Sequence, residues 1–377
     1  MNLRRVISLL PPLLLLAACS RPSAPGADSA ASAPAPPVAD ITSEARAWAD
    51  SVTDAMTLEE QVGQLFMPAS FTRTDKATMR LMTKYVADDK VGGMVFLKGD
   101  TLSMRLIADS LQKISRIPMF LAVDAEWGLG MRLAGATVYP KNWLLTDVDE
   151  QWMYTYGHSV ASECAAVGLN MVLGPVLDVA PGPGTVMFRR SLGSDPEYVA
   201  RMGVAYARGV EDAGLIPVAK HFPGHGFTRT DSHDLLPLIR RTAAEMDSID
   251  LLPFRRYIDL GFPAIMAGHI AVPALSGDSV PAVLSPKVIS VLLRDRLRFH
   301  GLLITDALNM KALDGGMADS RAVATLRAGA DMLIAPVDTR RSEAEVIEAV
   351  RTGKLPQKTI QDRCRRILFY KYLFLLR

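Results

Sequence analysis

The chain has 377 residues, of which 49% are apolar, and its 42 basic and 40 acidic side chains leave a formal net charge of +2. This near balance gives no electrostatic reason to expect a nucleic-acid partner, and the length is ample for a large core. The three cysteines do not make a disulfide framework, so the composition is that of an ordinary soluble enzyme.

The N-terminal segment has the features of an export signal followed by a linker. Two arginines precede the apolar run 6–16, which leads into the tetrapeptide LAAC, a pattern typical of bacterial lipoproteins. We expect cleavage of residues 1–18, lipid attachment to Cys19 and a disordered Ala-, Pro- and Ser-rich linker over residues 19–41. An ordinary signal peptide, in which Cys19 has no role, is the alternative. The predicted location is the cell envelope, on the periplasmic or outer-membrane face.

From residue 42 to residue 377, short apolar runs alternate with stretches of helical periodicity. The predicted strands cover residues 65–68, 93–97, 119–123, 171–176, 216–219, 264–267, 302–305 and 331–335. The predicted helices cover residues 101–115, 149–167, 196–213, 243–260, 285–297, 320–328, 342–352 and 355–377. This alternation favours an α/β fold, a single (β/α)₈ barrel of the TIM type, over residues 42–377. A doubly wound open sheet is the alternative, although no Gly-rich phosphate-binding fingerprint follows the first strand.

Ionisable residues follow several of these runs directly. In a (β/α)₈ barrel, catalytic side chains stand at the C-terminal ends of the strands, so we expect these groups to meet at one mouth. They are Asp124 and Glu126, Asp178, Lys220 and His221, His269, and Asp306. The stretch 220–237, KHFPGHGFTRTDSHDLLP, is predicted as a loop that also carries Asp231 and His233.

Most of these residues also have a structural interpretation. Asp178 is expected to hold a loop, and His225 to fix the Gly-rich loop around it. His269 is either a hydrogen-bonded wall residue or a substrate contact. Asp306 resists such an explanation, because a charge directly after the apolar run 302–305 would be unpaired at the barrel rim. The histidines have no metal-ligand spacing, so no metal site is predicted.

The segments KHFPGHG at 220–226 and TDSH at 230–233 resemble glycoside hydrolase family 3, specifically its single-domain β-N-acetylglucosaminidase branch. The resemblance covers roughly residues 52–377 and keeps the segments in the order expected of that family. The further matching segments are EEQVGQLFM at 59–67, GGMVFLKG at 92–99, RRSLGSDP at 189–196, AIMAGHI at 264–270, GLLITDALNMKAL at 301–313 and AGADMLIAP at 328–336.

The resemblance implies roles for individual residues. Asp306 matches the catalytic nucleophile, His233 the general acid/base, and Asp231 the partner of that histidine. The residues that match sugar-binding positions of the −1 subsite are Asp124, Arg190, Lys220 and His221. The resemblance implies no cofactor.

These residue types suit the implied chemistry. A retaining glycosidase needs a carboxylate to attack the anomeric carbon and an acid to protonate the leaving oxygen. A histidine acid is exceptional, but its unperturbed pKa of about 6.5 makes both protonation states accessible near neutrality. Residues two apart in an extended loop point to the same side, so Asp231 can hydrogen-bond His233 and fix its tautomer. Because the chain ends soon after the eighth predicted strand and its helix, we expect the acid to come from the barrel or from a partner, which favours His233.

Two residues depart from the pattern of the branch. Trp127, in DAEWGLGMR, stands where many relatives have glycine, so the sequence assigns no role to the preceding Glu126. Phe227 stands in the loop where a polar residue is usual.

We therefore predict a lipid-anchored, cofactor-independent exo-β-N-acetylglucosaminidase that acts on cell-wall fragments or other glycans. The enzymatic alternatives are a phosphorylase, because a neutral imidazole would not repel phosphate, and a β-glucosidase or β-xylosidase on the same barrel. A non-catalytic glycan-binding lipoprotein is the alternative from another class. The expected partners are a carbohydrate substrate and a membrane reached through the lipid, with no nucleic acid. A monomer is expected.

Overall fold

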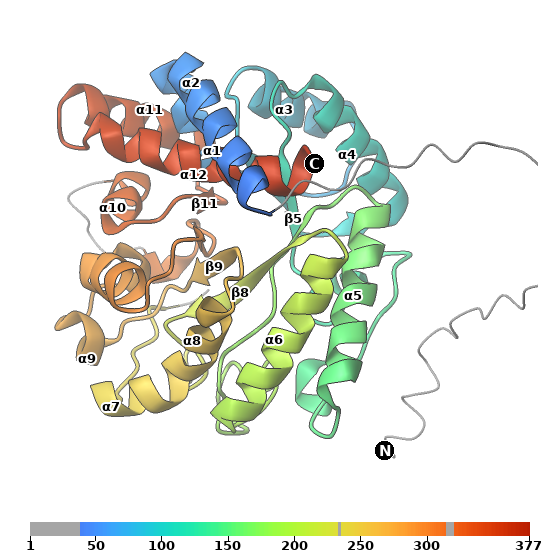
Figure 1. Cartoon of the computed structure of the whole chain (residues 1–377), viewed down its shortest axis with the longest axis vertical. Helices are drawn as coiled ribbons and strands as arrows, with labels where there is room; N and C mark the ends of the chain where they lie inside the picture. Colours follow the sequence, from blue (N-terminus) through green and yellow to red (C-terminus); the bar gives the residue numbers. More distant parts are fainter. Residues whose placement is uncertain (1–37, 233–234, 314–319) are drawn as a thin grey trace, which may run out of the picture. The chain divides into compact units, whose positions relative to one another are not determined.

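The computed structural model describes residues 38–232, 235–313 and 320–377. These residues form a mixed α/β fold in which helices surround a curled sheet of parallel strands (Figure 1). The predicted α/β class with parallel strands is therefore confirmed.

The main sheet has seven strands in the order β10-β9-β8-β7-β5-β3-β2, and β1 pairs with β11. Their bounds are β1 Phe66–Met67, β2 Ala69–Ser70, β3 Gly93–Phe96, β5 Phe120–Val123, β7 Met171–Val172, β8 Ile216–Phe222, β9 Ala264–Ala267, β10 Leu302–Thr305 and β11 Leu333–Ile334. All eight predicted strands are found, and Pro68 divides the first of them into β1 and β2. A small pair, β4 Gly99–Asp100 and β6 Leu133–Ala134, was not predicted.

Both edges of the main sheet continue into the β1–β11 pair. Only Pro68 separates β2 from β1, and β1 pairs with β11 in parallel register. At the other edge, Thr305 of β10 donates its backbone N–H to Met332 O over 3.0 Å, directly before β11. Every residue of β3, β5, β8, β9 and β10 is buried, which explains why these strands are mostly apolar, although β8 also includes Lys220 and His221.

The predicted helices are found between the strands, but the helices at Val38–Ala55, Leu58–Gly63 and Lys76–Ala87 were not predicted, and the first of them begins inside the predicted linker 19–41. The helices are α1 Val38–Ala55, α2 Leu58–Gly63, α3 Lys76–Ala87, α4 Thr101–Ile114, α5 Glu150–Ala166, α6 Pro196–Asp212, α7 Ala243–Glu245, α8 Leu251–Asp259, α9 Pro273–Ser276, α10 Arg321–Ala328, α11 Thr339–Arg351 and α12 Gln357–Leu375, with π-helical segments at Met246–Asp250 and Lys287–Arg296. α11 begins before the predicted residue 342, because Asp338 caps it by accepting from Arg341 N. No helix within the described ranges is long and apolar enough to cross a bilayer.

The prediction for residues 220–222 is wrong. The stretch from residue 220 was expected to be loop, but Lys220, His221 and Phe222 belong to β8. The strand continues because Phe222 pairs with Ala267 of β9 after a register shift. Lys220 and His221 are therefore held by the sheet and not by the Gly-rich loop that follows.

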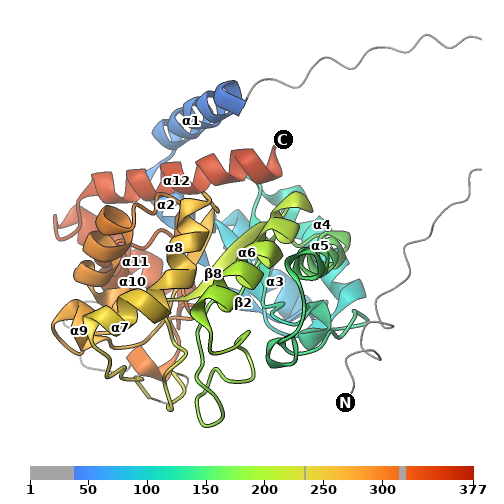
Figure 2. The ribbon, with the colours of Figure 1, turned by 60° about the horizontal axis from the view of Figure 1, so that its bottom comes forward.

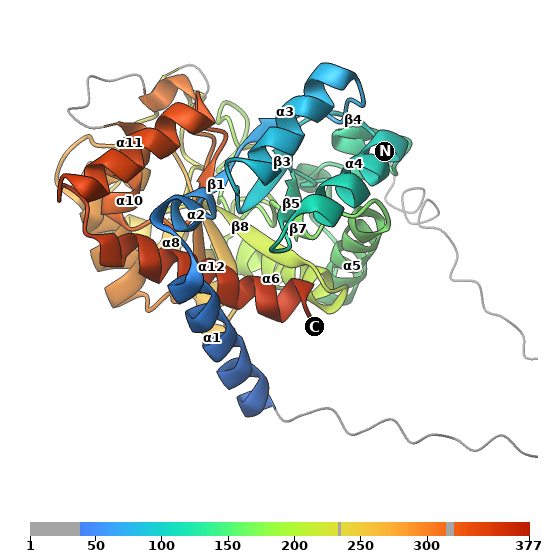
Figure 3. The same cartoon turned by 90° about the horizontal axis from the view of Figure 1, so that it is seen from above.

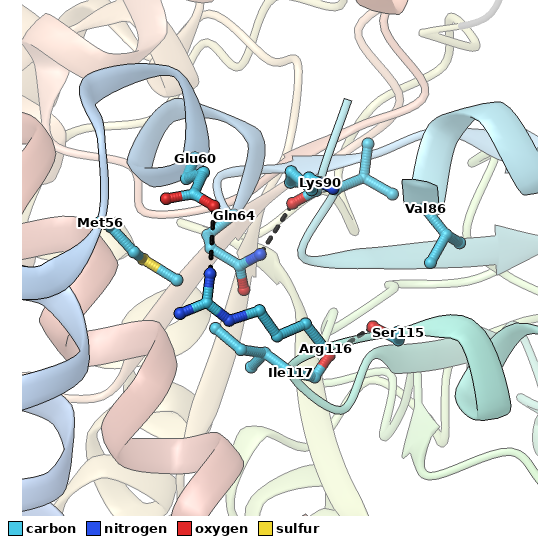
Figure 4. Close-up of a pocket in the computed structure, with 9 residues that line it drawn as sticks. Met56, Glu60, Gln64, Val86, Lys90, Ser115, Arg116 and Ile117 are labelled. Atoms are coloured by element: carbon cyan, nitrogen blue, oxygen red, sulfur yellow. Dashed lines mark hydrogen bonds and ion pairs between the residues drawn. The ribbon is translucent and has the colours of Figure 1, made fainter. Parts of the chain in front are cut away.

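The end of the sheet where the strands begin is covered by α1, α2 and α12, and α1 lies against α12 (Figures 2 and 3). A small pocket opens there, lined by Met56, Glu60, Gln64, Val86, Lys90, Val91, Ser115, Arg116 and Ile117 (Figure 4). Gln64 forms part of the pocket wall and makes two hydrogen bonds there. Its Nε2 donates to Lys90 O over 2.7 Å, and its Oε1 accepts from Lys371 Nζ over 2.7 Å. Lys371 of α12 is fully buried.

The buried Lys371 is expected to make stability rise with pH. Burial lowers its pKa from 10.5 to about 7, while Cys364 acts weakly in the opposite direction. Between these values the unfolded chain holds a proton that the folded chain lacks, so the free energy of unfolding increases by up to about 1.4 kcal/mol per pH unit. Urea unfolding of the wild type and Lys371→Met between about pH 7 and pH 9.5 measures this difference.

The wild-type free energy of unfolding should rise relative to that of the variant across this range. Replacement of the exposed Lys358 by methionine is the matched control and should leave the wild-type pH dependence unchanged. A constant difference between wild type and Lys371→Met would contradict a lowered pKa of this amine.

Candidate active site

Charged side chains meet where the parallel strands end. Lys220 of β8 reaches Asp124, which directly follows β5, and donates to Asp124 Oδ1 over 2.7 Å. Its Nζ also lies 2.8 Å from Glu126 Oε1. The Lys220 side chain is 1% exposed and that of Glu126 is 2% exposed, so this contact is inside the protein.

Two arginines complete this arrangement. Arg190 donates to Glu126 through Nε over 2.9 Å and through Nη2 over 2.6 Å, a bidentate pair. Arg132 donates to Asp124 Oδ2 over 2.6 Å. We call the chain of contacts Arg132–Asp124–Lys220–Glu126–Arg190 the ion network.

The ion network keeps its members charged. Burial raises the pKa of Asp124, but Lys220 and then Arg132 outweigh it and hold that pKa below its usual value. In the same way, Arg190 and Lys220 overcome burial and hold the pKa of Glu126 far below its usual range. Asp124 and Glu126 in turn raise the pKa of Lys220 against the effect of its burial. The site therefore holds fixed charges around the buried Lys220 and Glu126, which suits the orientation of polar hydroxyl groups.

The sequence placed Glu126 among the residues at the strand ends but gave it no role, and it did not identify Arg132. Arg132 reaches Asp124 because the chain turns back between them through Gly128 and the short helical turn Leu129–Met131. The charged residues in the segment DAEWGLGMR were the signal from which both residues could have been identified. Trp127 is half-buried, and its ring lies 5.2 Å from the Lys141 ammonium.

His221 is fixed by the buried Asp178. Because a carboxylate only accepts, His221 Nδ1 donates to Asp178 Oδ2 over 2.7 Å. The other ring nitrogen, Nε2, lies 3.3 Å from Arg190 Nη2, where an arginine N–H can only donate. His221 therefore has a defined tautomer beside the ion network.

Asp178 and His225 hold the start of the loop after β8, as the sequence suggested. Asp178 Oδ1 accepts from the backbone N–H of His225 over 2.6 Å and from that of His221 over 3.3 Å. The ring of His225 contacts the Thr228 hydroxyl over 2.5 Å. Burial, followed by the neighbouring His221, lowers the pKa of His225 to about 4, so its ring is neutral in ordinary conditions.

Asp306 directly follows β10 and is half-buried. Its backbone N–H donates to Ala267 O over 3.0 Å, and its Oδ1 accepts from Ala307 N over 2.7 Å. Burial raises the pKa of Asp306, but the rings of His269 and His221, the Ala307 N–H and Lys220 together hold it at about 2. The carboxylate is therefore ionised and lies within electrostatic reach of the β8 residues.

His269 lies beside Asp306 and is completely buried. Its Nε2 donates to Ala307 O over 2.9 Å, while Nδ1 has no hydrogen-bond partner among the described residues. Burial lowers the pKa of His269 against the opposing effect of Asp306, which favours a neutral ring. The geometry supports the wall-residue interpretation of His269.

The loop residue Asp231 is half-buried, and its carbonyl accepts from Leu235 N over 3.1 Å. His233 and Cys19 lie outside the described residues, so their predicted roles stay predictions.

The family model for the "Glycosyl hydrolase family 3 N terminal domain" matches residues 57–369, which is most of the chain. The chain belongs to glycosyl hydrolase family 3. The predicted family is therefore confirmed, and so is the predicted class of enzyme, a glycoside hydrolase.

The chain is also similar to several named proteins. A β-hexosaminidase of Chromobacterium violaceum is 32% identical over 311 residues, which cover 79% of this chain and 84% of the relative. A glycoside hydrolase family 3 β-N-acetylglucosaminidase from Paenibacillus sp. str. FPU-7 superimposes with a TM-score of 0.78 at 32% identity, covering 84% of this chain and 63% of that chain. The β-glucoside phosphorylase BglX bound to 2FGlc gives a TM-score of 0.81 at 27% identity, with coverage of 88% and 62%. The chain thus spans less than two thirds of both solved structures.

Proposed function

We propose that the protein is a retaining exo-β-N-acetylglucosaminidase. The observation that carries this proposal is the ion network, which lies within electrostatic reach of the ionised Asp306 where parallel strands end. Relatives that are about a third identical and are named β-hexosaminidase support the sugar that the enzyme would release. In this account the ion network binds the terminal sugar and Asp306 reacts with it.

In the first step, a carboxylate oxygen of Asp306 forms a bond to the anomeric carbon while the bond to the leaving oxygen breaks. His233 gives its proton to that oxygen, so that the aglycone leaves as an alcohol. The low pKa of Asp306 keeps the attacking group deprotonated. Asp231 would orient the imidazole and stabilise its charged form.

In the second step, His233 takes a proton from water, and the hydroxide oxygen replaces Asp306 on the anomeric carbon. The sugar then leaves with its original configuration. Asp124, Arg190, Lys220 and His221 would bind the sugar hydroxyls throughout. Because these side chains already hold one another, little reorganisation accompanies binding.

We further propose that the parallel strands close into an eight-stranded barrel. The link from Thr305 N to Met332 O and the β1–β11 pairing support closure, since they connect both edges of the main sheet. A closed barrel brings the C-terminal ends of β5, β8 and β10 to one mouth.

The location and natural substrate are also proposals. The LAAC segment supports a lipid anchor at Cys19 in the cell envelope. A protein located in the cell envelope would meet cell-wall fragments that carry terminal N-acetylglucosamine, so we propose these fragments as its substrate.

The alternative is a phosphorylase on the same barrel. The structural similarity to a β-glucoside phosphorylase favours it, because that relative has a TM-score of 0.81 to this chain. The two reactions differ in the second step, where phosphate would replace water as the group that attacks the anomeric carbon.

Turnover of aryl β-N-acetylglucosaminide and aryl β-glucoside, with and without phosphate, tests these proposals. We expect selective release of the aryl group from the N-acetyl sugar, with free N-acetylglucosamine as the product in both buffers. The sugar 1-phosphate as the product would instead establish the phosphorylase. Turnover of the glucoside alone would place the chain with the β-glucosidases. Glycan binding without turnover by folded protein would favour the non-catalytic alternative.

A further inference from the structure

The loop that follows β8 contains an aromatic residue with a cation packed closely on its face. Phe227 is half-buried, and the guanidinium carbon of Arg241 lies 3.7 Å from the centroid of its ring. Contacts of this kind are stronger where the cation has little access to water. The Arg241 side chain is only 10% exposed, so its guanidinium is largely shielded from water.

A buried carboxylate holds Arg241 in place. Arg241 Nη1 lies 3.2 Å from Asp250 Oδ2, and the Asp250 side chain is completely buried. Neither carboxylate oxygen of Asp250 accepts a hydrogen bond from the described residues. Burial, with a smaller contribution from Asp178, raises the pKa of Asp250 to about 7 against the opposing effect of Arg241.

Stability does not explain this aspartate. A buried carboxylate without hydrogen bonds is costly, and an apolar residue of similar volume commonly serves a core better. Asp250, the last residue of the π-helical segment Met246–Asp250, therefore has a role other than stabilising the core. Turns of π-helix recur at functional sites. Outside its own helix, Asp250 contacts the loop that follows β8.

Asp250 touches this loop directly as well as through Arg241. Gly224 has φ +124°, and a Cβ added there would lie 2.7 Å from Asp250 Cβ, so the loop backbone packs on the aspartate side chain. The same part of the loop has two further contacts: Asp178 accepts from His225 N over 2.6 Å, and Val186 N donates to Thr228 O over 3.0 Å. Two buried carboxylates, those of Asp250 and Asp178, therefore contact residues 224–228.

We propose that Phe227, Arg241 and Asp250 form a clamp that positions the loop carrying Asp231, so that the acid/base function of the enzyme depends on a cation–π contact outside the sugar site. This inference rests on the proposed function, because Asp231 is the proposed partner of the acid. Phe227, Arg241 and Asp250 are positioning residues, and Asp231 follows Phe227 by only four positions. The clamp also gives a physical reason for Phe227 at a position where a polar residue is usual.

Dependence on the leaving group separates positioning of the acid from general loss of structure. An aglycone such as dinitrophenol leaves without a proton, whereas methylumbelliferone and methanol need increasing help from the acid. We measure kcat/KM of wild type and Phe227→Leu on this series of β-N-acetylglucosaminides. Leucine keeps the apolar volume but removes the ring face.

We expect Phe227→Leu to lower kcat/KM by about 10- to 100-fold on the methyl glycoside and by less than about threefold on the dinitrophenyl glycoside. Phe227→Tyr keeps the ring face and should stay within about threefold of wild type on every substrate. Arg241→Lys replaces the flat guanidinium by a point charge and should reproduce the selective loss. It also provides a second variant if Phe227→Leu does not fold.

The matched control is Phe369→Leu, which removes a half-buried cation–π contact with Arg46 on the covered side of the sheet. Its kcat/KM should match wild type on all substrates. An equal loss by Phe227→Leu across the series, or no loss, would overturn the clamp. Failure of the wild type to release any aglycone would instead overturn the proposed function on which the clamp rests.

Discussion

Replacement of Asp306 by asparagine is expected to lower kcat on an aryl β-N-acetylglucosaminide by at least about 10⁴-fold. The amide has nearly the same volume and can still accept from Ala307 N, but it cannot bond to the anomeric carbon as a carboxylate does. The wild-type carboxyl has a pKa of about 2 and is fully ionised in the assay, so the substitution removes the reactive species outright.

The control for this variant is Asp278→Asn, an exposed aspartate that is not among the residues of the candidate site. Its kcat should equal that of the wild type within a factor of about two. Circular dichroism and the midpoint of urea unfolding verify that Asp306→Asn is folded. A folded Asp306→Asn that keeps a tenth or more of wild-type kcat, about 1.4 kcal/mol in activation free energy, would exclude Asp306 as the nucleophile.

Replacement of Lys220 by methionine should have the largest effect on stability. Lys220 is 1% exposed and lies between Asp124 and Glu126, so its loss leaves two carboxylates of the ion network facing each other without the cation between them. Removing one partner of a buried ion pair destabilises a protein by about 3 to 5 kcal/mol. The same change removes a proposed sugar contact, so we expect kcat/KM to fall by at least about 100-fold.

Urea unfolding and kinetics of Lys220→Met measure both effects, with Lys358→Met as the control. Lys358 is 78% exposed in an ion pair with Asp362, and such pairs contribute about 1 kcal/mol or less. A loss of stability no larger in Lys220→Met than in this control would contradict the account of the ion network.

The strands were the most predictable part of the fold. The run 264–267 is apolar throughout and the run 302–305 is apolar up to Thr305, and the sequence placed both with the bounds that β9 and β10 have. The side chains at the strand ends followed from the same pattern, because parallel strands bring their carboxyl ends to one edge. This reasoning correctly brought Asp124 and Lys220 together over a separation of 96 residues.

The features that the sequence did not predict depend on contacts between segments that are far apart in the chain. Nothing local distinguishes Lys220 and His221 as strand residues, since the strand continues through them only because Lys220 pairs with Val176 and Phe222 pairs with Ala267. Arginine side chains are usually exposed, so the sequence gives no reason to single out Arg132 or Arg241. Only the fold brings Arg132 to Asp124 and Arg241 to Phe227. Side-chain networks of this kind have no periodicity, so a hydrophobic pattern does not reveal them.

The most direct test of the central claim is to trap the glycosyl-enzyme. The protein is incubated with a fluorinated N-acetylglucosaminyl fluoride that forms the intermediate quickly and releases it slowly, then digested and analysed by mass spectrometry. We predict one added fluoro-N-acetylglucosaminyl group per chain, carried by the peptide that contains Asp306. A label on another residue, or full turnover of the reagent with inverted product and no label, would contradict a retaining mechanism at Asp306.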